Sequence, residues 1–310
     1  MIQMGDTKIS LDRREAGVDF DFISHAHSDH VAAAKSSGAV ISSDQTGQLV
    51  ECAYGVKTNR VNLPENMRLL EAGHMLGSKQ LYVENKETGT RVVYSGDFNT
   101  GVPKTAKPIE IVGCEHLILD STYYGPEFNF GDKQSAERSM VDWVKGRLEK
   151  GSVIFSAYKM GKAQELISIF NNAGISPIVS DKVGGISKIY QYNGVDLKYS
   201  TVEQNKENES NFVGITENRN FAAFSSVLAR LQGIPVYTAM ASGFAKIWKM
   251  GTDMQFIVSD HADFNQSLDY IEATGAKQIY TYGPSSKLFA DNLCKAGYAA
   301  EPLPEQKTFV

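Results

Sequence analysis

The chain has 310 residues, 42% of them hydrophobic and 22% charged, which is an ordinary balance for a globular protein. Its apolar runs fall far short of the ~20 residues that cross a bilayer, and no charged and then apolar leader opens it, so we expect a cytoplasmic protein with no membrane partner. The net charge of −5 argues at face value against a nucleic-acid partner, and three cysteines without CxxC spacing predict thiols in a reducing compartment.

Short β-rich runs separated by turn signals occupy the first third of the chain. The segment 84–94 predicts a hairpin with Gly89 in its turn. An alanine-rich helix that ends near Gly38 is expected soon after the first long apolar strand. The expected strands are 18–24, 38–43, 67–73, 79–86, 90–97 and 116–120.

The middle of the chain alternates between helix and strand. A helix over 134–151 precedes a strand, loop and helix over 151–174, and the alternation continues through 176–181, 220–233 and 234–243. This order is typical of an α/β domain with a parallel sheet. The polar stretch 201–211 is expected to be an exposed loop, and strand and helix alternate again from Met254 to Gly297.

Charge is distributed unevenly along the chain. Residues 129–258 hold 15 Lys and Arg against 12 Asp and Glu, whereas the remainder holds 16 against 24. A segment of opposite sign to its flanks suggests a separate module with a separate partner. A chance distribution of surface charge explains the pattern equally well.

Four metal-competent side chains stand within six residues of the stretch SHAHSDH. They are His25, His27, Asp29 and His30, and half of the six histidines of the chain lie here. Imidazole and carboxylate groups are ligands that zinc prefers, and a bound cation would keep the crowded imidazoles neutral. The stretch follows a buried-looking strand, so these side chains are expected to converge in a loop as a metal site.

Further candidate ligands follow other apolar runs. His74 follows one run, Asp97 ends another, and Asp260 and His261 follow a third. Because loops after strands collect on one edge of a sheet, these groups are expected to join the first cluster. His116 has no such context and is interpreted as a structural residue.

The motifs His-x-His-x-Asp-His, Gly-His and Ser-Gly-Asp, in this order, resemble those of the metallo-β-lactamase superfamily. LILDSTYYGPEFNF (Leu117–Phe130) resembles the acidic motif that opens the extra domain of the β-CASP nucleases, in the form of the crosslink-repair nucleases and Artemis. VIFSAYKMGKAQELI and VSDHADFNQSLDYIEATGAKQIYTYG resemble the ligase-associated exonucleases of that group. The resemblance covers the chain from Asp12 to about Leu303.

The resemblance implies an α/β (α+β) fold, a metallo-β-lactamase αββα sandwich with an inserted α/β β-CASP cap domain. The sandwich would comprise residues 1–128 and 256–310, and the cap would comprise residues 129–255. The active site would lie in a groove where the two domains meet, which is a common place for ligand sites.

The resemblance also implies roles for the candidate residues. Asp12 would orient a metal ligand without touching the metal. Asp120 matches the acidic motif and His261 matches the histidine that partners it, so both would act in catalysis together with Asp97. The metal ligands would be His25, His27 and His74 for a first zinc ion, Asp29 and His30 for a second, and Asp97 between the two.

One position departs from the family pattern. In the RNA-cleaving members a histidine before a glycine completes the second metal site, whereas Tyr282 stands at that position here. A phenolic oxygen is a poor zinc ligand near neutral pH because its pKa is ~10. We therefore expect one tightly bound zinc ion and a second site that is weak or empty, with manganese as an alternative ion. DNA-acting members also lack this histidine, which favours DNA over RNA.

The loop within FSAYKMGKAQE is a candidate phosphate site. Lys159 and Lys162 flank Gly161 between a strand and a helix, and backbone N–H groups at a helix start carry partial positive charge. An ordinary turn with surface lysines is an equal alternative. Ser242 and Gly243 could supply further backbone donors.

Aromatic side chains accompany these loops. Tyr158, Phe244 and Trp248 could stack on the bases of a single strand, and packing in a core is an equal alternative for each.

Together these residues predict a metal-dependent phosphodiester hydrolase, a nuclease and expected exonuclease, that acts on DNA or RNA in nucleic-acid processing or repair. Zinc would activate water and polarise a phosphoryl oxygen, and His261, held by Asp120, would donate a proton to the leaving oxygen. The alternatives are a small-molecule hydrolase of lactones or thioesters, an RNA-processing endonuclease of the 3′-end-processing type, and a nucleic-acid binder without catalysis. A homodimer is left open.

Overall fold

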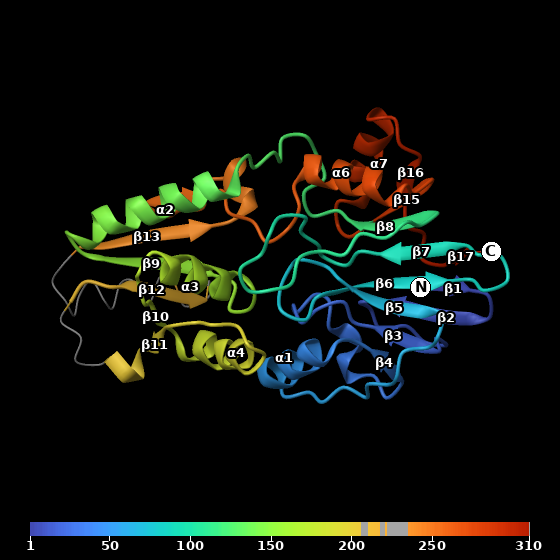
Figure 1. The fold of residues 1–310 in the computed structure, drawn as a ribbon, viewed down its shortest axis with the longest axis horizontal. Coiled ribbons are helices and arrows are strands. Elements are labelled where there is room, and N and C mark those ends of the chain that lie inside the picture. The colour runs from blue at the N-terminus through green and yellow to red at the C-terminus, as the bar shows by residue number, and fades with distance from the viewer. Residues whose placement is uncertain (206–209, 218–220, 222–234, 310) are drawn as a thin grey trace. The chain divides into compact units, whose positions relative to one another are not determined.

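The computed structural model describes residues 1–205, 210–217, 221 and 235–309 (Figure 1). Two compact units make up the chain: unit 1 comprises Met1–Asn129 and His261–Val310, and unit 2 comprises Phe130–Asp260. No helix within the described ranges is long and apolar enough to span a membrane. The helix expected over 220–233 lies outside the described residues apart from residue 221, and so does part of the loop expected over 201–211.

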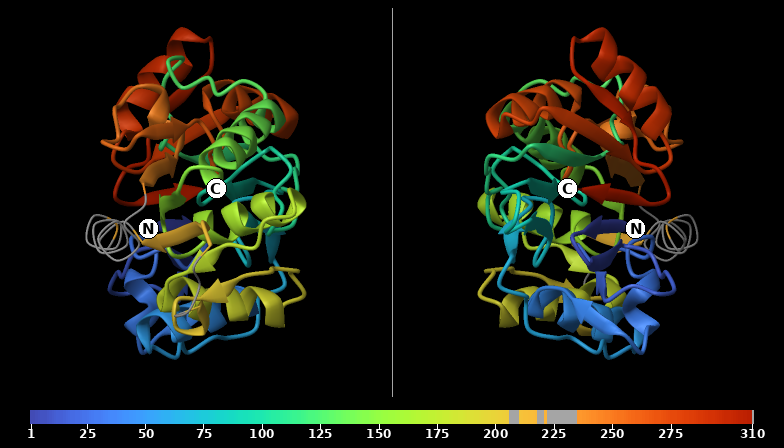
Figure 2. Two further views of the ribbon diagram at one scale, coloured as in Figure 1. Left: turned by 90° about the vertical axis from the view of Figure 1, so that its left-hand side faces the viewer. Right: turned by 90° about the vertical axis from the view of Figure 1, so that its right-hand side faces the viewer.

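Unit 1 is built on two mixed sheets. The first has the strand order β17-β1-β2-β3-β4, and the second has the order β16-β15-β8-β7-β6-β5. β1 pairs in parallel with β17, so the two ends of the chain lie side by side (Figures 1 and 2). The strands are β1 (Ile2–Met4), β2 (Thr7–Leu11), β3 (Phe20–Phe22), β4 (Ala39–Ile41), β5 (Met67–Glu71), β6 (Lys79–Glu84), β7 (Arg91–Tyr94), β8 (His116–Asp120), β15 (Gln278–Tyr282), β16 (Ala300–Pro302) and β17 (Lys307–Phe309).

The two sheets of unit 1 face each other across an apolar core. Phe22 of β3 and Tyr94 of β7 meet edge to face, with ring centroids 6.0 Å apart. In β8, Ile118 joins this core, while Leu117 and Leu119 point to the other face and join a second buried cluster. Because side chains alternate along a strand, a run that is apolar at every position indicates a strand covered on both faces.

Helices supply the cover on the outer faces. Tyr270 of α6 and Phe289 of α7 belong to the second cluster, on the outer face of the second sheet. α1 begins where Ser43 accepts a hydrogen bond from the N–H of Thr46, and it ends at Gly55, whose φ of 66° suits glycine. The helices of unit 1 are η1 (Ala32–Lys35), α1 (Asp44–Tyr54), α6 (Phe264–Thr274) and α7 (Ser286–Lys295).

Two local predictions can be compared with unit 1 directly. The hairpin is confirmed, because β6 and β7 are antiparallel and Gly89 has a φ of 72°. The alanine-rich helix ending near Gly38 is wrong, since Ala32–Lys35 form only a 3-10 turn. Val31 has no polar side chain to cap a helix there, and the backbone is already extended at Ser36.

Unit 2 is an α/β unit whose described strands are all parallel, in the order β11-β10-β12-β9-β13-β14. All six residues of the central strand β9 are buried, as expected for a parallel strand covered on both faces. The α/β class predicted from the sequence is confirmed. The elements are α2 (Lys133–Leu148), β9 (Ser152–Ala157), α3 (Lys162–Asn172), β10 (Ile178–Val179), α4 (Asp181–Tyr192), β11 (Ser200–Thr201), η2 (Glu203–Asn205), β12 (Val213–Glu217), β13 (Val236–Ala241), η4 (Gly243–Lys246) and β14 (Met254–Phe256).

Candidate metal centre

The candidate residues of unit 1 follow the carboxyl ends of strands that share a direction within each sheet. β2 and β3 are parallel in the first sheet, and β5, β7, β8 and β15 point the same way in the second. The polar residues at these carboxyl ends are Asp12 after β2, the loop His25–His30 after β3, His74 after β5, Asp97 after β7, Asp120 at the end of β8 and Tyr282 at the end of β15.

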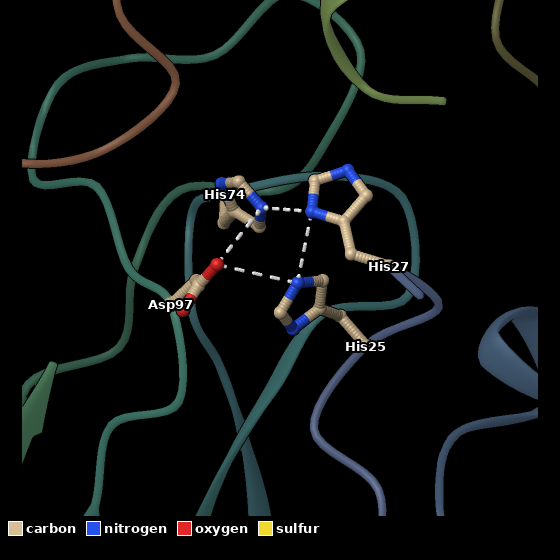
Figure 3. A group of neighbouring side chains, drawn as sticks. All are labelled: His25, His27, His74 and Asp97. Carbon is tan, nitrogen blue, oxygen red and sulfur yellow. Dashed lines mark hydrogen bonds and ion pairs between the residues drawn. The ribbon is translucent and has the colours of Figure 1, made fainter. Parts of the chain in front are cut away.

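Four of these side chains converge on one point (Figure 3). Nε2 of His25 lies 3.0 Å from Nδ1 of His27, which lies 3.3 Å from Nε2 of His74. Oδ2 of Asp97 lies 3.3 Å from Nε2 of His25 and 3.8 Å from Nε2 of His74. Residues from three separate parts of the chain thus form a ring of three nitrogens and one oxygen.

The spacing of this ring fits a tetrahedral cation. Four ligand atoms at ~2.1 Å from a tetrahedral zinc ion lie about 3.4 Å from one another, and the four distances here run from 3.0 to 3.8 Å. Neutral ring nitrogens that face each other direct lone pairs at each other, and a cation between them removes that repulsion. The donor set of imidazole and carboxylate groups is one that zinc prefers.

Asp12 fixes two of the histidines through their Nδ1 atoms, directly for His30 and through Ser24 for His25. Its Oδ2 accepts hydrogen bonds from the hydroxyls of Ser24 and Tyr94, both at 2.7 Å, and from Nδ1 of His30 at 2.8 Å. Nδ1 of His25 lies 2.9 Å from the Ser24 hydroxyl, whose proton is already given to Asp12. His25 therefore carries its proton on Nδ1, which leaves the Nε2 lone pair facing the ring of ligands.

A second ligand position adjoins the first. Nε2 of His30 lies 3.3 Å from Oδ1 of Asp97. The other oxygen of Asp97, Oδ2, is the one that faces His25. Oδ2 of Asp29 lies 3.5 Å from the same nitrogen, but the side chain of Asp29 is 78% exposed. This second position therefore has one buried ligand, Asp97, one partly buried ligand, His30, and one exposed ligand, Asp29.

The protonation states of His25, His30 and Asp97 depend on one another. Burial and the neighbouring His30 hold the pKa of His25 well below its usual value. Burial also disfavours the charged form of His30, but the carboxylates of Asp97 and Asp12 outweigh it and raise its pKa to about 10. The pKa of Asp97 is lowered despite its burial, because His30 and His25 stabilise its negative charge.

Asp120 and His261 form a pair beside the same carboxylate. Nδ1 of His261 lies 3.5 Å from Oδ2 of Asp120, and its Nε2 lies 3.8 Å from Oδ2 of Asp97. The hydroxyl and N–H of Thr122 donate to Oδ1 of Asp120 at 3.0 and 3.2 Å, which fixes the carboxylate. Burial and the charge of Asp97 raise the pKa of Asp120. The same oxygen of Asp97, Oδ2, therefore faces both the histidines of the ligand ring and this acid–histidine pair.

The hydroxyl of Tyr282 is hydrogen-bonded to the backbone and is not a metal ligand here. The phenol donates to the backbone carbonyl of Leu11 at 2.9 Å. The guanidinium of Arg13 lies over its ring at 4.9 Å, and the ring of Tyr94 packs against it at 5.4 Å. Burial raises the pKa of Tyr282 to about 12, so its ionised form is scarce near neutral pH.

The phosphate candidates of unit 2 follow adjacent strands. Lys159 and Gly161 follow β9, and Ser242 and Gly243 follow β13, which pairs with β9 in parallel. The chain leaves β9 through α3 toward β10 on one side, and leaves β13 toward β14 on the other. In parallel sheets, ligands bind outside the carboxyl ends at the point where the strand order reverses in this way.

The side chain of Lys162 is buried and hydrogen-bonded within unit 2. The residue is only 6% exposed, and its ammonium donates to the carbonyl of Val258 at 2.8 Å and to Oδ1 of Asp260 at 2.7 Å. Asp260, one of the potential metal ligands named from the sequence, is therefore paired with a lysine. This pairing contradicts the prediction that Lys162 binds a phosphate of the substrate.

Some contributing residues were missed at the level of sequence. Ser24 and Tyr94 complete the hydrogen bonds of Asp12, and Thr122 fixes Asp120. Ser24 directly precedes the histidine motif, so its position was a usable signal. Tyr94 lies 82 residues from Asp12 in the chain, and no local pattern connects the two.

Comparisons with known proteins give several relatives, although no protein-family model matches the chain. A probable DNA ligase of Opitutus terrae is 24% identical over 300 residues, which are 92% of this chain and 28% of the relative. An RNase J-like protein of Methanocaldococcus jannaschii is 31% identical over 126 residues, 40% of this chain and 30% of the relative. The DNA cross-link repair protein pso2/snm1 of Schizosaccharomyces pombe is 28% identical over 174 residues, 49% and 31% of the two chains.

The chain thus spans less than a third of the length of each of these three relatives. Among solved structures, a protein of unknown function from Enterococcus faecalis has a similar fold, with a TM-score of 0.60 and 10% identity. The match covers 94% of this chain and 81% of the other.

Proposed function

Since this chain belongs to the β-CASP nuclease group of the metallo-β-lactamase superfamily, we propose that it is a metal-dependent phosphodiesterase that cleaves nucleic acid. The observation that carries the proposal is the position of Asp97. Its Oδ2 atom faces both the histidine ring and Nε2 of His261, which is paired with Asp120. A cation site and a proton donor therefore adjoin one another, and phosphodiester hydrolysis requires both.

The proposed resident metal is a zinc ion held by His25, His27, His74 and Asp97. Such an ion lowers the pKa of water toward ~7 and polarises a phosphoryl oxygen. Asp29 and His30, with Asp97, would hold a second ion weakly, because the Tyr282 hydroxyl is bound to a backbone carbonyl. Imidazole ligands also accept manganese with lower affinity, so manganese is the alternative ion.

The residues of the chain itself have separate tasks in the proposed reaction. His261 donates a proton to the oxygen that leaves phosphorus, and Asp120 orients its imidazole through Nδ1. Thr122 keeps Asp120 in place. Asp12, through Ser24, keeps His25 in the tautomer that presents Nε2 to the ligand ring. It also holds Nδ1 of His30 directly, so that Nε2 of His30 faces Oδ1 of Asp97.

We further propose that residues 129–255 are the inserted cap domain of this group and bind the phosphates of the substrate, with residues 1–128 and 256–310 as the metal domain. The reversal of strand order between β9 and β13 supports a ligand site at Lys159, Gly161, Ser242 and Gly243.

DNA is the favoured substrate, and exonuclease action in repair is the favoured mode. An RNA-processing endonuclease is the second candidate, supported by the similarity to an RNase J-like protein. A hydrolase of small lactones or thioesters would not need an inserted domain of this size. The proposal includes a cytoplasmic location, and the oligomeric state is to be measured.

The test is incubation of the purified protein with end-labelled single-stranded DNA, RNA of the same sequence and a model thioester. Metal-dependent release of labelled nucleotides from either nucleic acid is expected. Progressive shortening from one end would indicate an exonuclease, and internal products would indicate an endonuclease. Hydrolysis of the thioester alone would refute the proposal.

A further inference from the structure

An exposed tryptophan stacked on a phenylalanine follows β13 in unit 2. The rings of Phe244 and Trp248 are nearly parallel, with an interplanar angle of 8° and centroids 4.7 Å apart. Trp248 is nevertheless 54% exposed. Phe244 therefore covers one face of the indole, while more than half of Trp248 stays exposed. A large exposed aromatic ring of this kind offers a stacking surface for a planar ligand.

Hydrogen bonds hold the segment that carries this stack. The N–H of Trp248 donates to the carbonyl of Phe244 at 2.9 Å. Nε2 of Gln255, on β14, donates to the carbonyls of Ala245 and Trp248, both at 2.9 Å, and its Oε1 accepts from the N–H of Met250 at 2.9 Å. The stack is therefore already in place before a ligand arrives, which reduces the entropy cost of binding.

Two lysines lie close to Trp248 in the chain. Lys246 and Lys249 are both exposed, and neither forms an ion pair with an acidic side chain in the part of the chain that the structure describes. The surrounding segment 129–258 has more basic than acidic residues, unlike the rest of the chain. An exposed aromatic ring with a lysine on each side of it in the chain is complementary to a base and the phosphates next to that base.

The stack also lies next to the candidate phosphate loops in the chain. η4 begins at Gly243, directly after Ser242, and these residues follow the carboxyl end of β13 where the strand order reverses. We propose that Phe244 and Trp248 form a stacking site for an unpaired base of single-stranded nucleic acid, with Lys246 and Lys249 on the flanking phosphates. This inference rests on the proposed function and narrows its substrate to strands with unpaired bases, because bases within a duplex have no open face.

The first test measures binding of the full chain to a fluorescein-labelled oligothymidylate of about 15 nucleotides with phosphorothioate linkages, which resist hydrolysis. Trp248→Ala is expected to raise the Kd about 5- to 150-fold, and Trp248→Phe, which keeps an aromatic ring, is expected to stay near wild type. Tyr192→Ala is the matched control, because Tyr192 is 80% exposed but ends α4, at the opposite edge of the same parallel sheet. A duplex of the same length should show no effect of Trp248→Ala.

The salt dependence of binding tests the proposed roles of Lys246 and Lys249. A double variant, Lys246→Gln with Lys249→Gln, is expected to reduce the slope of log Kd against log salt concentration by about 1.4, because each phosphate contact on a single strand contributes ~0.7. An unchanged slope would overturn the assignment of the lysines to phosphates.

The second test uses the fluorescence of Trp248 itself. The chain has 2 tryptophans, so Trp143→Phe leaves Trp248 as the sole emitter. Quenching of this emission by the oligothymidylate is expected, with the midpoint at the Kd of the first test. Quenching that instead follows protein concentration in the absence of oligonucleotide would mean that a second copy of the chain covers the indole, and would overturn the proposal.

The two proposals can fail separately. If the oligonucleotide binds and Trp248→Ala leaves the Kd unchanged, or if Tyr192→Ala weakens binding equally, the stacking site is refuted whether or not the chain cleaves nucleic acid. If Trp248→Ala weakens binding selectively but no nucleic acid is hydrolysed, the stacking site stands and the nuclease proposal fails.

Discussion

Replacing Asp12 with asparagine tests how the metal ligands are oriented. Oδ2 of Asp12 accepts three hydrogen bonds and Oδ1 accepts one, from the N–H of Ser24 at 2.6 Å. In Asp12→Asn the least costly orientation puts the new NH₂ group at the Oδ1 position, so that one buried donor loses its acceptor. Residue 12 is only 1% exposed, so water cannot replace that acceptor. The expected loss in the free energy of unfolding is ~1–3 kcal/mol.

The same change should weaken metal binding. The neutral amide no longer polarises His30 directly or His25 through Ser24, and removal of such supporting groups costs ~10–100-fold in metal affinity. Zinc affinity is measured by competition with a chromophoric chelator, and stability by urea denaturation of the metal-free chain. Asp21→Asn is the control, because Asp21 is 2% exposed and accepts a hydrogen bond from Ser10 on the neighbouring strand, away from the ligand ring.

The two variants should differ in zinc affinity. Asp12→Asn should lose both stability and zinc affinity, whereas Asp21→Asn, whose amide oxygen still accepts from Ser10, should bind zinc like the wild type. If Asp12→Asn loses stability and still binds zinc like the wild type, Asp12 has a structural role and the account of ligand orientation is incorrect.

His261→Ala is expected to lower turnover of a single-stranded oligonucleotide ~10²–10⁴-fold while the amount of bound zinc stays unchanged. His116→Ala is the control and should leave turnover unchanged. Loss of zinc in His261→Ala would mean that His261 is a metal ligand. Tyr282→Phe should lower the free energy of unfolding by ~1 kcal/mol, as the hydrogen bond to Leu11 is lost, while zinc per chain by atomic absorption stays constant. Cys114 is 2% exposed, and burial raises the pKa of its thiol to about 12. It should therefore react with a disulfide reagent only after denaturation, whereas the exposed Cys52 and Cys294 should react in the native chain. Hydrogen bonds from Arg91 lower the pKa of Glu115 to about 2, so this pair stabilises the fold above pH ~4.5 and less so as the pH falls toward 2. Arg91→Gln should therefore cost under ~1 kcal/mol at pH 7 and less near pH 3.5 in urea denaturation, and equal costs at both values would contradict this.

Local sequence was sufficient for the parts of the site that lie close together in the chain. Three histidines within six residues predict a metal loop from the sequence alone, and apolar runs before His74, Asp97 and Asp120 place those residues at strand ends. The shared direction of these strands then brings the side chains to one edge, which is a consequence of sheet geometry.

Tertiary contacts decided what the sequence could not. Lys162 resembles a phosphate ligand at a helix start, but Asp260, 98 residues later, takes its ammonium. The alanine-rich stretch after the histidine motif has good helix propensity, but without a capping side chain it forms only one 3-10 turn. Tyr282 was recognised as a departure from the family pattern, whereas the turn of its hydroxyl toward Leu11 depends on packing against Tyr94 and Arg13.

The central claim is that His25, His27, His74 and Asp97 hold a cation on which cleavage of nucleic acid depends. The most direct measurement is cleavage of end-labelled single-stranded DNA by the full chain before chelation, after chelation with metal removal verified, and after one equivalent of zinc is returned. The account predicts that activity disappears and then returns, with one zinc bound per chain in the wild type and none in His74→Ala. Full activity of a verified metal-free chain would contradict it.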